Sequence, residues 1–105
     1  MINPDRLVNT FLDLVLIDSP SGQEALIGRD LQGRFSDLGL STYIDEHGNV
    51  IGRLEGDGDQ WLLLSAHMDT VGKDTGIHPV IRDGIIRSDG TTILGSDDKS
   101  GVRCV

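Results

Sequence analysis

Cysteine is almost absent from this sequence, because Cys104 is the single one among 105 residues. A disulfide framework within the chain is therefore excluded, and a lone thiol is typical of a reducing compartment. Basic residues are also scarce: 9 Lys and Arg stand against 17 Asp and Glu, which gives a formal net charge of −8. This balance argues against a nucleic-acid-binding surface, which needs clustered Lys and Arg.

Long apolar runs are missing as well. A membrane-spanning helix takes about 20 consecutive apolar residues, whereas the run Leu14–Ile17 is bounded by Asp13 and Asp18. The N-terminus has no basic region followed by an apolar stretch, so we predict no signal peptide. We therefore expect a cytoplasmic protein without membrane contact. With 37% hydrophobic and 25% charged residues, the composition suits a globular domain rather than a disordered chain.

Two helices are predicted in the first forty residues. Asn3 and Pro4 suit the N-cap and first position of a helix, and its apolar stripe comprises Leu7, Phe11, Leu14 and Val15. Ser21 and Glu24 fit a capping box for a second helix, which Gly39 would end. The predicted core face of this second helix comprises Leu26, Ile27, Leu31, Phe35 and Leu38.

The apolar period then changes to two, which favours strands. Thr42–Ile44 and Val50–Leu54 are predicted to form a hairpin, and Asp83-Gly84 predicts a second one between residues 80–81 and 85–87. The continuous apolar run Trp61–Ala66 is typical of a strand buried on both faces. Another helix is predicted to begin at Gly101. We expect an α/β fold with a mixed sheet flanked by helices, all within one domain.

The segment 65–71, Ser-Ala-His-Met-Asp-Thr-Val, is the first that could carry chemistry. His67 and Asp69 follow the run that is predicted to be the most buried strand, and ligands of open α/β sheets bind beyond the carboxyl ends of strands. Asp69 could accept the proton of one ring nitrogen of His67 and leave the other free for a metal. Taken alone, this pattern equally fits a turn with an Asp cap and an unrelated His.

The segment 94–101, Leu-Gly-Ser-Asp-Asp-Lys-Ser-Gly, is the second segment that could carry chemistry. A carboxylate has two oxygens and can bridge two cations, as two-metal hydrolytic sites require, and Lys99 could offset the local charge. The same residues also suit an ordinary helix N-terminus, where Asp is favoured by the helix dipole. The sequence has no phosphate-binding loop, EF-hand or nucleophile motif. His47 and His78 are interpreted as ordinary exposed histidines.

Taken together, the two segments resemble the signature blocks of the dinuclear zinc exopeptidases that include peptidase T, glutamate carboxypeptidase and acetylornithine deacetylase. Ser19–Glu24 and the stretch 77–93 also resemble peptidase T-like proteins. The resemblance covers nearly the whole chain and implies the N-terminal part, residues 1–105, of a zinc-peptidase catalytic domain.

The resemblance implies two zinc ions, with cobalt or manganese as possible substitutes, and a water activated between them. It implies that His67 binds one metal, that Asp97 bridges both, and that Asp69 acts in catalysis by orienting His67. Asp98 is the alternative to Asp97 as the bridging ligand. The implied activity is that of an aminopeptidase of the tripeptidase type, acting on small peptides.

The resemblance also implies parts that lie outside these residues. The general base, a Glu in a Glu-Glu pair, and the remaining metal ligands would follow Val105, as would the rest of the catalytic domain. A lid or dimerisation domain, through which a homodimer could form, would also lie elsewhere. We therefore predict that the isolated chain binds zinc weakly and has no peptidase activity.

Other interpretations of the sequence stay open. A related metal-dependent amidase or deacylase would use the same ligands, although Asp97-Asp98-Lys99 is closer to peptidase T, since the deacylases usually have an apolar residue after the bridging Asp. A non-catalytic acidic interaction module and a magnesium-dependent phosphoryl-transfer domain are further alternatives. His67 argues against the latter, because imidazole suits zinc or cobalt better than magnesium.

Overall fold

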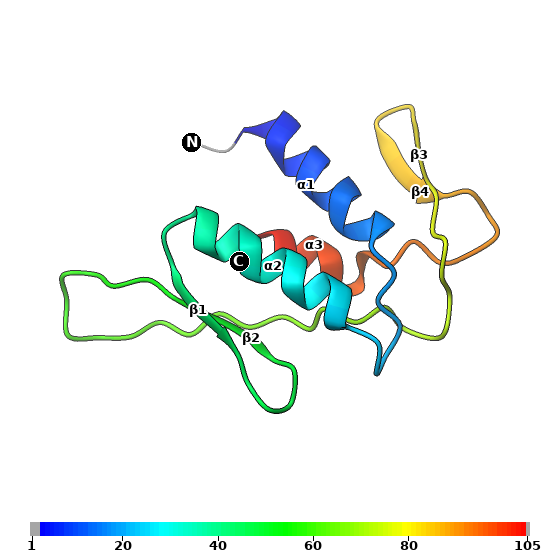
Figure 1. The fold of residues 1–105 in the computed structure, drawn as a ribbon. Coiled ribbons are helices and arrows are strands. Elements are labelled where there is room, and N and C mark those ends of the chain that lie inside the picture. The colour runs from blue at the N-terminus through cyan, green and yellow to red at the C-terminus, as the bar shows by residue number, and fades with distance from the viewer. Residues whose placement is uncertain (1–2, 105) are drawn as a thin grey trace.

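The structure of the chain is a computed structural model that describes residues 3–104 (Figure 1). Its helices and strands follow one another in the order α1 (Pro4–Leu16), α2 (Ala25–Asp37), β1 (Ser41–Ile44), β2 (Val50–Arg53), β3 (Pro79–Arg82), β4 (Ile85–Ser88) and α3 (Ser96–Cys104). Helices and strands occur together, so the predicted α/β class is confirmed. Within residues 3–104 the strands form two separate antiparallel pairs, β1–β2 and β3–β4, in place of the expected mixed sheet.

Helix α1 begins where the sequence predicts. The Asn3 side chain accepts hydrogen bonds from the backbone N–H groups of Asp5 and Arg6, which otherwise have no partner in the first helical turn. Pro4 needs no hydrogen-bond acceptor at this position. Of the predicted stripe, Phe11, Leu14 and Val15 are buried, so this face of α1 packs against the rest of the chain.

Helix α2 begins differently from the prediction, and the capping box is wrong. Glu24 is the N-cap residue and makes no side-chain capping bond to the helix; its Oε1 instead accepts from the N–H of Gly22 over 2.7 Å. The Ser21 hydroxyl is bonded elsewhere, to Asp69. At the other end Gly39 has φ +88°, which confirms its predicted place after the helix.

The apolar face of α2 is narrower than predicted. Ile27 and Leu31 are buried, but Leu26 and Leu38 are 64% and 58% exposed. The packing elements explain the difference: α2 contacts the β1–β2 hairpin on one side, and its side chains join a small core with Leu14 of α1. Because α2 packs against only these neighbours, it buries fewer apolar positions than a full helical stripe would.

Both predicted hairpins are confirmed. β1 pairs with β2 so that Ile44 lies opposite Val50, and β3 pairs with β4 so that Arg82 lies opposite Ile85. Asp83 and Gly84 between the latter strands have φ angles of 54° and 74°. Two consecutive positive φ angles match the right-handed twist of a hairpin, which is why Asp-Gly is favoured there.

The predicted strand Trp61–Ala66 is wrong. The segment has no assigned strand in the structure, and its apolar side chains are exposed, with Leu62 and Leu63 at 83% and 88%. A strand buried on both faces needs neighbours on each edge and layers above and below. Within residues 3–104 the segment pairs with no strand, and it runs as an extended stretch below α2 (Figure 1).

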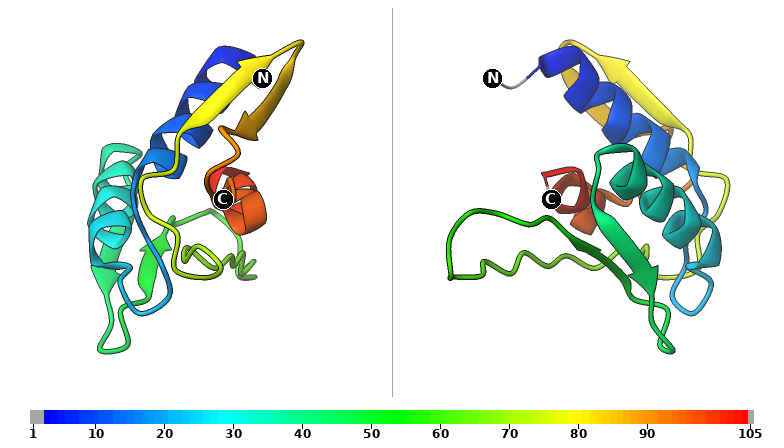
Figure 2. Two further views of the ribbon diagram at one scale, coloured as in Figure 1. Left: turned by 90° about the vertical axis from the view of Figure 1, so that its right-hand side faces the viewer. Right: turned by 60° about the vertical axis from the view of Figure 1, so that its left-hand side comes forward.

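Helix α3 begins earlier than predicted, at Ser96 rather than Gly101, although Asp97 and Asp98 themselves have non-helical backbone angles. Val105, the last residue of the predicted helix, lies outside the described residues. α3 packs against α1, and β3 also contacts α1 (Figure 2). No helix in the described part of the chain is long and apolar enough to cross a membrane.

Two small groups of buried side chains hold these elements together. Phe11 and Val15 of α1 pack with Ile77, which precedes β3. Leu14 of α1 packs with Ile27 and Leu31 of α2, and Met68 and Val102 lie against this second group. The second group therefore fixes residues 67–69 and α3 relative to the two helices.

Candidate functional site

Residues 68–70 are held against the loop that joins α1 and α2. The backbone N–H of Thr70 donates to the carbonyl of Ser19 over 2.7 Å, and the Ser19 hydroxyl lies 3.1 Å from the carbonyl of Met68 and 3.2 Å from the Thr70 hydroxyl. Ser19 and Thr70 are 1% and 0% exposed. Buried hydrogen bonds of this kind have no competing water, so they fix where the neighbouring residues point.

The start of α3 approaches the same place through Gly95. A methyl group added at Gly95 would lie 3.4 Å from the Thr70 side chain and 3.7 Å from Ile77, and its φ is +83°. Glycine tolerates this angle, which is costly for other residues. The close passage of Gly95 brings Asp97 beside the segment 67–69.

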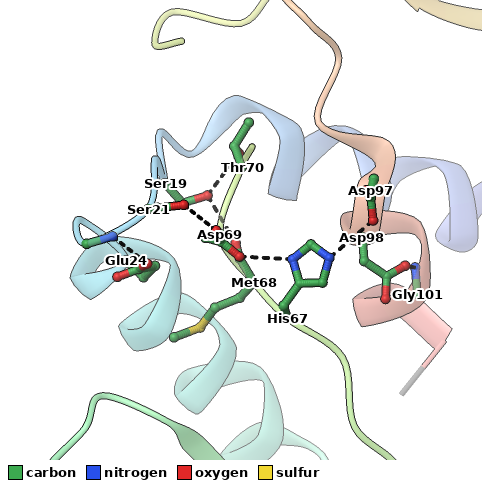
Figure 3. A network of polar contacts seen from close by, with 11 residues as sticks. Ser19, Ser21, Glu24, His67, Met68, Asp69, Thr70, Asp97, Asp98 and Gly101 are labelled. Atoms are coloured by element: carbon green, nitrogen blue, oxygen red, sulfur yellow. Dashed lines mark hydrogen bonds and ion pairs between the residues drawn. The ribbon is translucent and has the colours of Figure 1, made fainter. Parts of the chain in front are cut away.

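His67 lies between two carboxylates at the point where these segments meet (Figure 3). Its Nδ1 is 2.9 Å from Asp69 Oδ1, and its Nε2 is 3.1 Å from Asp97 Oδ1. An ionised carboxylate can only accept hydrogen bonds, so each ring nitrogen that carries a proton donates it to the facing oxygen. The structure thus brings together the three predicted site residues His67, Asp69 and Asp97.

The second oxygen of Asp69 also has a partner. Ser21 donates its hydroxyl proton to Asp69 Oδ2 over 2.5 Å, so both oxygens of this carboxylate are engaged. Ser21, Asp69, His67 and Asp97 form a continuous chain of side-chain contacts (Figure 3). It begins in the loop before α2 and ends at the start of α3.

The charges in this chain of contacts are coupled. Hydrogen bonds to Asp97 and then to Asp69 raise the pKa of His67 above its ordinary value. The hydrogen bond from Ser21 is the largest cause that lowers the pKa of Asp69, and the bond to His67 adds to it. The arrangement therefore favours an ionised Asp69 and a basic imidazole.

The two neighbouring aspartates of α3 have different surroundings. Asp97 faces His67 and its side chain is 80% exposed. Asp98 turns toward its own helix, where Oδ1 accepts from the N–H of Gly101 over 3.0 Å. Of the two aspartates, only Asp97 is placed to bind the same metal ion as His67. This agrees with the choice made from the sequence, and the role of Asp97 as a metal ligand stays a prediction.

The sequence suggested that Lys99 could offset the charge of the aspartates, but its side chain points elsewhere. Its side chain is 0% exposed, and Nζ donates to the backbone carbonyl of Ile17 over 3.0 Å. Burial lowers the pKa of this ammonium group, and the charge of Asp18 opposes that effect. Lys99 therefore joins the start of α3 to the end of α1.

An open groove of about 510 Å³ runs beside the site. It is lined by residues of α2 and β2 and by the segment 63–69, and His67 and Asp69 form part of its wall. The side chain of His67 is 48% exposed. A small molecule in the groove could therefore reach the imidazole.

The donor chemistry of the site fits a divalent cation in part. An imidazole nitrogen and a carboxylate oxygen converge, and a second carboxylate holds the other ring nitrogen, as is common behind metal-bound histidines. A zinc site takes roughly four donors. Among residues 3–104, however, no group of three or more His, Cys, Asp or Glu side chains is arranged to hold a metal ion.

Solved structures resemble the chain over almost its whole length. A tripeptidase from Staphylococcus aureus superposes with a TM-score of 0.92 at 42% identity over 98% of the chain. Aminopeptidase PepT from Bacillus cereus gives a TM-score of 0.86 at 43% identity over 97% of it. The chain has a peptidase T-like fold.

The peptidase T-like chain also has curated relatives. A putative [LysW]-lysine/[LysW]-ornithine hydrolase from Thermococcus kodakarensis is 39% identical over 82% of the chain. The chain spans 30% of the length of each of the two solved proteins and 24% of the Thermococcus relative. No protein-family model matches it.

The sequence did not point to several residues that shape this peptidase T-like site. Ser19, Thr70 and the Ser21 contact to Asp69 were missed, since each depends on a pairing about fifty positions apart. One signal was available: Ser19–Glu24 belongs to the resemblance, yet it contains no metal ligand. A segment that takes part in the family resemblance but supplies no metal ligand is a candidate for holding a metal ligand in position.

Proposed function

We propose that this chain forms part of a metal-dependent exopeptidase that removes residues from small peptides, with His67 and Asp97 as metal ligands. The observation that carries the proposal is the convergence of His67 Nε2 and Asp97 Oδ1 at 3.1 Å from segments thirty residues apart. The tripeptidase and the aminopeptidase with the same fold support this choice of reaction. The activity proposed is that of the longer polypeptide to which such a chain corresponds.

Each of the three side chains has a separate role in this proposal. His67 offers Nε2 to a cation, while its Nδ1–H is held by Asp69. Asp97 offers a carboxylate with two oxygens, which suits a ligand shared between two cations. Asp69 acts by fixing the ring orientation of His67 and by increasing its basicity.

Two zinc ions are the proposed cofactor, with cobalt or manganese as substitutes, and they would polarise the scissile carbonyl and lower the pKa of a water. The general base and the other ligands are proposed to come from outside this chain. The substrate would approach along the groove beside His67, whose volume of about 510 Å³ suits a short peptide. A cytoplasmic location and a homodimer formed through another domain complete the proposal.

An amidase acting on a related bond is the second candidate. The Thermococcus relative, which is named as a putative [LysW]-lysine/[LysW]-ornithine hydrolase, favours it. The exopeptidase is preferred because both solved proteins with higher identity are peptidases. The two activities differ in substrate and share the ligands proposed here.

Zinc titration by calorimetry tests the ligands on this chain. We expect weak zinc binding that is lost in His67→Ala and Asp97→Asn and is retained in His78→Ala, which alters an exposed histidine elsewhere. Equal binding by the wild-type chain and His67→Ala would refute the ligand assignment. Tight stoichiometric binding by the wild-type chain would show instead that the site is complete.

The reaction itself is tested on the longer product, if the encoding reading frame continues past Val105. That product should release the first residue of a tripeptide in the presence of zinc, cobalt or manganese, and His67→Ala should abolish the release. Hydrolysis of N-acyl amino acids without tripeptide cleavage would favour the amidase instead.

A further inference from the structure

Ser21 makes a side-chain contact that the start of the following helix does not explain. It lies before α2, but its hydroxyl does not cap that helix. It donates instead to Asp69 Oδ2, 48 positions along the chain, over 2.5 Å. The residue is exposed, so burial of a polar group does not explain why its hydroxyl is engaged.

The neighbouring contacts place Ser21 accurately. Ser19, two positions earlier, is buried and bonded to Met68 and Thr70, and Pro20 pairs with Thr70 as an isolated parallel bridge. These contacts align the loop with residues 68–70. Ser21, the next residue of this loop, is thereby placed so that its hydroxyl meets the Asp69 carboxylate.

A carboxylate held at one oxygen only can rotate about its last side-chain bond. Asp69 Oδ1 must face His67 Nδ1 for the 2.9 Å contact between them to persist. A donor on Oδ2 removes that rotation, because turning the carboxylate would break both contacts. Strong hydrogen bonds to an ionised oxygen are well suited to this purpose.

We propose that Ser21 is a positioning residue, whose hydroxyl locks the Asp69 carboxylate so that Oδ1 keeps the imidazole of His67 in one orientation. Its consequence for metal binding rests on the proposed function, while the lock itself does not. Ser19 has a different role, because it holds the loop to residues 68–70 and its removal would loosen the fold.

Nuclear magnetic resonance of the His67 ring, in the metal-free chain labelled with ¹⁵N-histidine, tests the lock directly. We expect the wild-type chain to give a downfield Nδ1–H proton protected from solvent exchange. Ser21→Ala should lose this protection, Ser21→Thr should keep it, and Ser36→Ala, which alters an exposed serine of α2, should not change it. An unchanged Nδ1–H shift and exchange rate in Ser21→Ala would overturn the proposal.

Two further comparisons separate positioning from folding. Ser21→Ala should keep the thermal midpoint of the wild-type chain, whereas Ser19→Ala should lower it. If Ser21→Ala is itself unstable, Ser21→Thr and Ser21→Val decide, because they have the same shape and differ in the hydroxyl. Protection of the His67 ring proton in the threonine variant alone supports the lock; equal protection in both refutes it.

Titration with cobalt alone, followed by visible absorption, measures the consequence. Loss of a direct partner of a metal-bound histidine costs about 10–100-fold in affinity, and Ser21 lies one contact further away, so we expect about 3–10-fold weaker cobalt binding in Ser21→Ala. If His67→Ala binds cobalt as the wild type does, the proposed function fails. The role of Ser21 is then still tested by the exchange of the His67 Nδ1–H proton. If His67→Ala loses cobalt while Ser21→Ala keeps the ring proton protected, only the Ser21 proposal fails.

Discussion

The ammonium group of Lys99 donates a hydrogen bond to the backbone carbonyl of Ile17, joining residues 82 positions apart over 3.0 Å. The contact connects the first turn of α3 to the end of α1, and the side chain is completely buried. A charged group is rarely buried unless its donors are satisfied. The position of Asp97, two residues before Lys99, therefore depends on a link inside the protein.

Replacement of Lys99 by alanine should destabilise the chain. The variant leaves a cavity and an unpaired carbonyl, and we expect a loss of about 2–4 kcal/mol in the free energy of unfolding. Lys99→Met keeps most of the volume and should lose less, because it also removes the buried charge. Urea denaturation followed by circular dichroism measures both. Lys73→Ala, at an exposed lysine, is the control, and a Lys99→Ala variant as stable as this control would contradict the expectation.

Gly52 of β2 and Gly33 of α2 should respond to alanine in opposite directions. A methyl group at Gly52 would lie 2.9 Å from both Leu40 and Phe35, so we expect overpacking to cost about 1–3 kcal/mol. Nothing lies within 4 Å of such a group at Gly33, where alanine should stabilise the helix by about 0.8–1 kcal/mol. Denaturant midpoints of the two variants provide the comparison. Similar midpoints would show that the contacts of Gly52 adjust easily.

Asp45 should titrate below the ordinary aspartate pKa of 3.8, because hydrogen bonds from the Asn49 side chain and backbone, and then from the His47 N–H, lower its pKa. The ionised form thus stabilises the turn between β1 and β2 above that pH. This contribution is lost as the pH falls through the lowered pKa of the folded state. Carbon-13 resonances of the Asp45 carboxyl measure the midpoint, which Asn49→Ala should move up toward 3.8.

The segment 61–64 should bind apolar dyes. Its four side chains, Trp61, Leu62, Leu63 and Leu64, are between 57% and 88% exposed, and contiguous exposed apolar surface favours association. We expect Leu62→Lys with Leu63→Lys to reduce the fluorescence of bound anilinonaphthalene sulfonate and to reduce self-association. Leu38→Lys, at the exposed leucine that directly follows α2, should have little effect. Equal dye fluorescence in both variants would place the dye elsewhere.

Local chemistry was predictable where it acts within a few residues. Asn3 and Pro4 begin α1 as expected, and Asp83-Gly84 forms the expected turn, because cap and turn preferences depend on neighbouring backbone groups. Ser21 was assigned wrongly for the same reason. Its hydroxyl suits a cap by sequence, but a partner 48 positions away takes it instead.

Longer-range features could be predicted only in part. His67 and Asp97 were recognised as candidates from their motifs, but no periodicity could foresee that Gly95 and Thr70 pack closely enough to bring them within 3.1 Å. The run 61–66 has the composition of a buried strand and is exposed in the structure. Composition describes what a segment could pack against, while pairing depends on which strands lie beside it.

The position of Trp61 determines which part of this protein intrinsic fluorescence reports on. It is the single tryptophan of the chain, it is 64% exposed, and the guanidinium of Arg53 lies 4.3 Å from the centre of its ring. Intrinsic fluorescence therefore follows the surroundings of an extended surface segment, while circular dichroism follows the helices. A molecule that covered residues 61–64 would shift the emission and leave the helical signal unchanged.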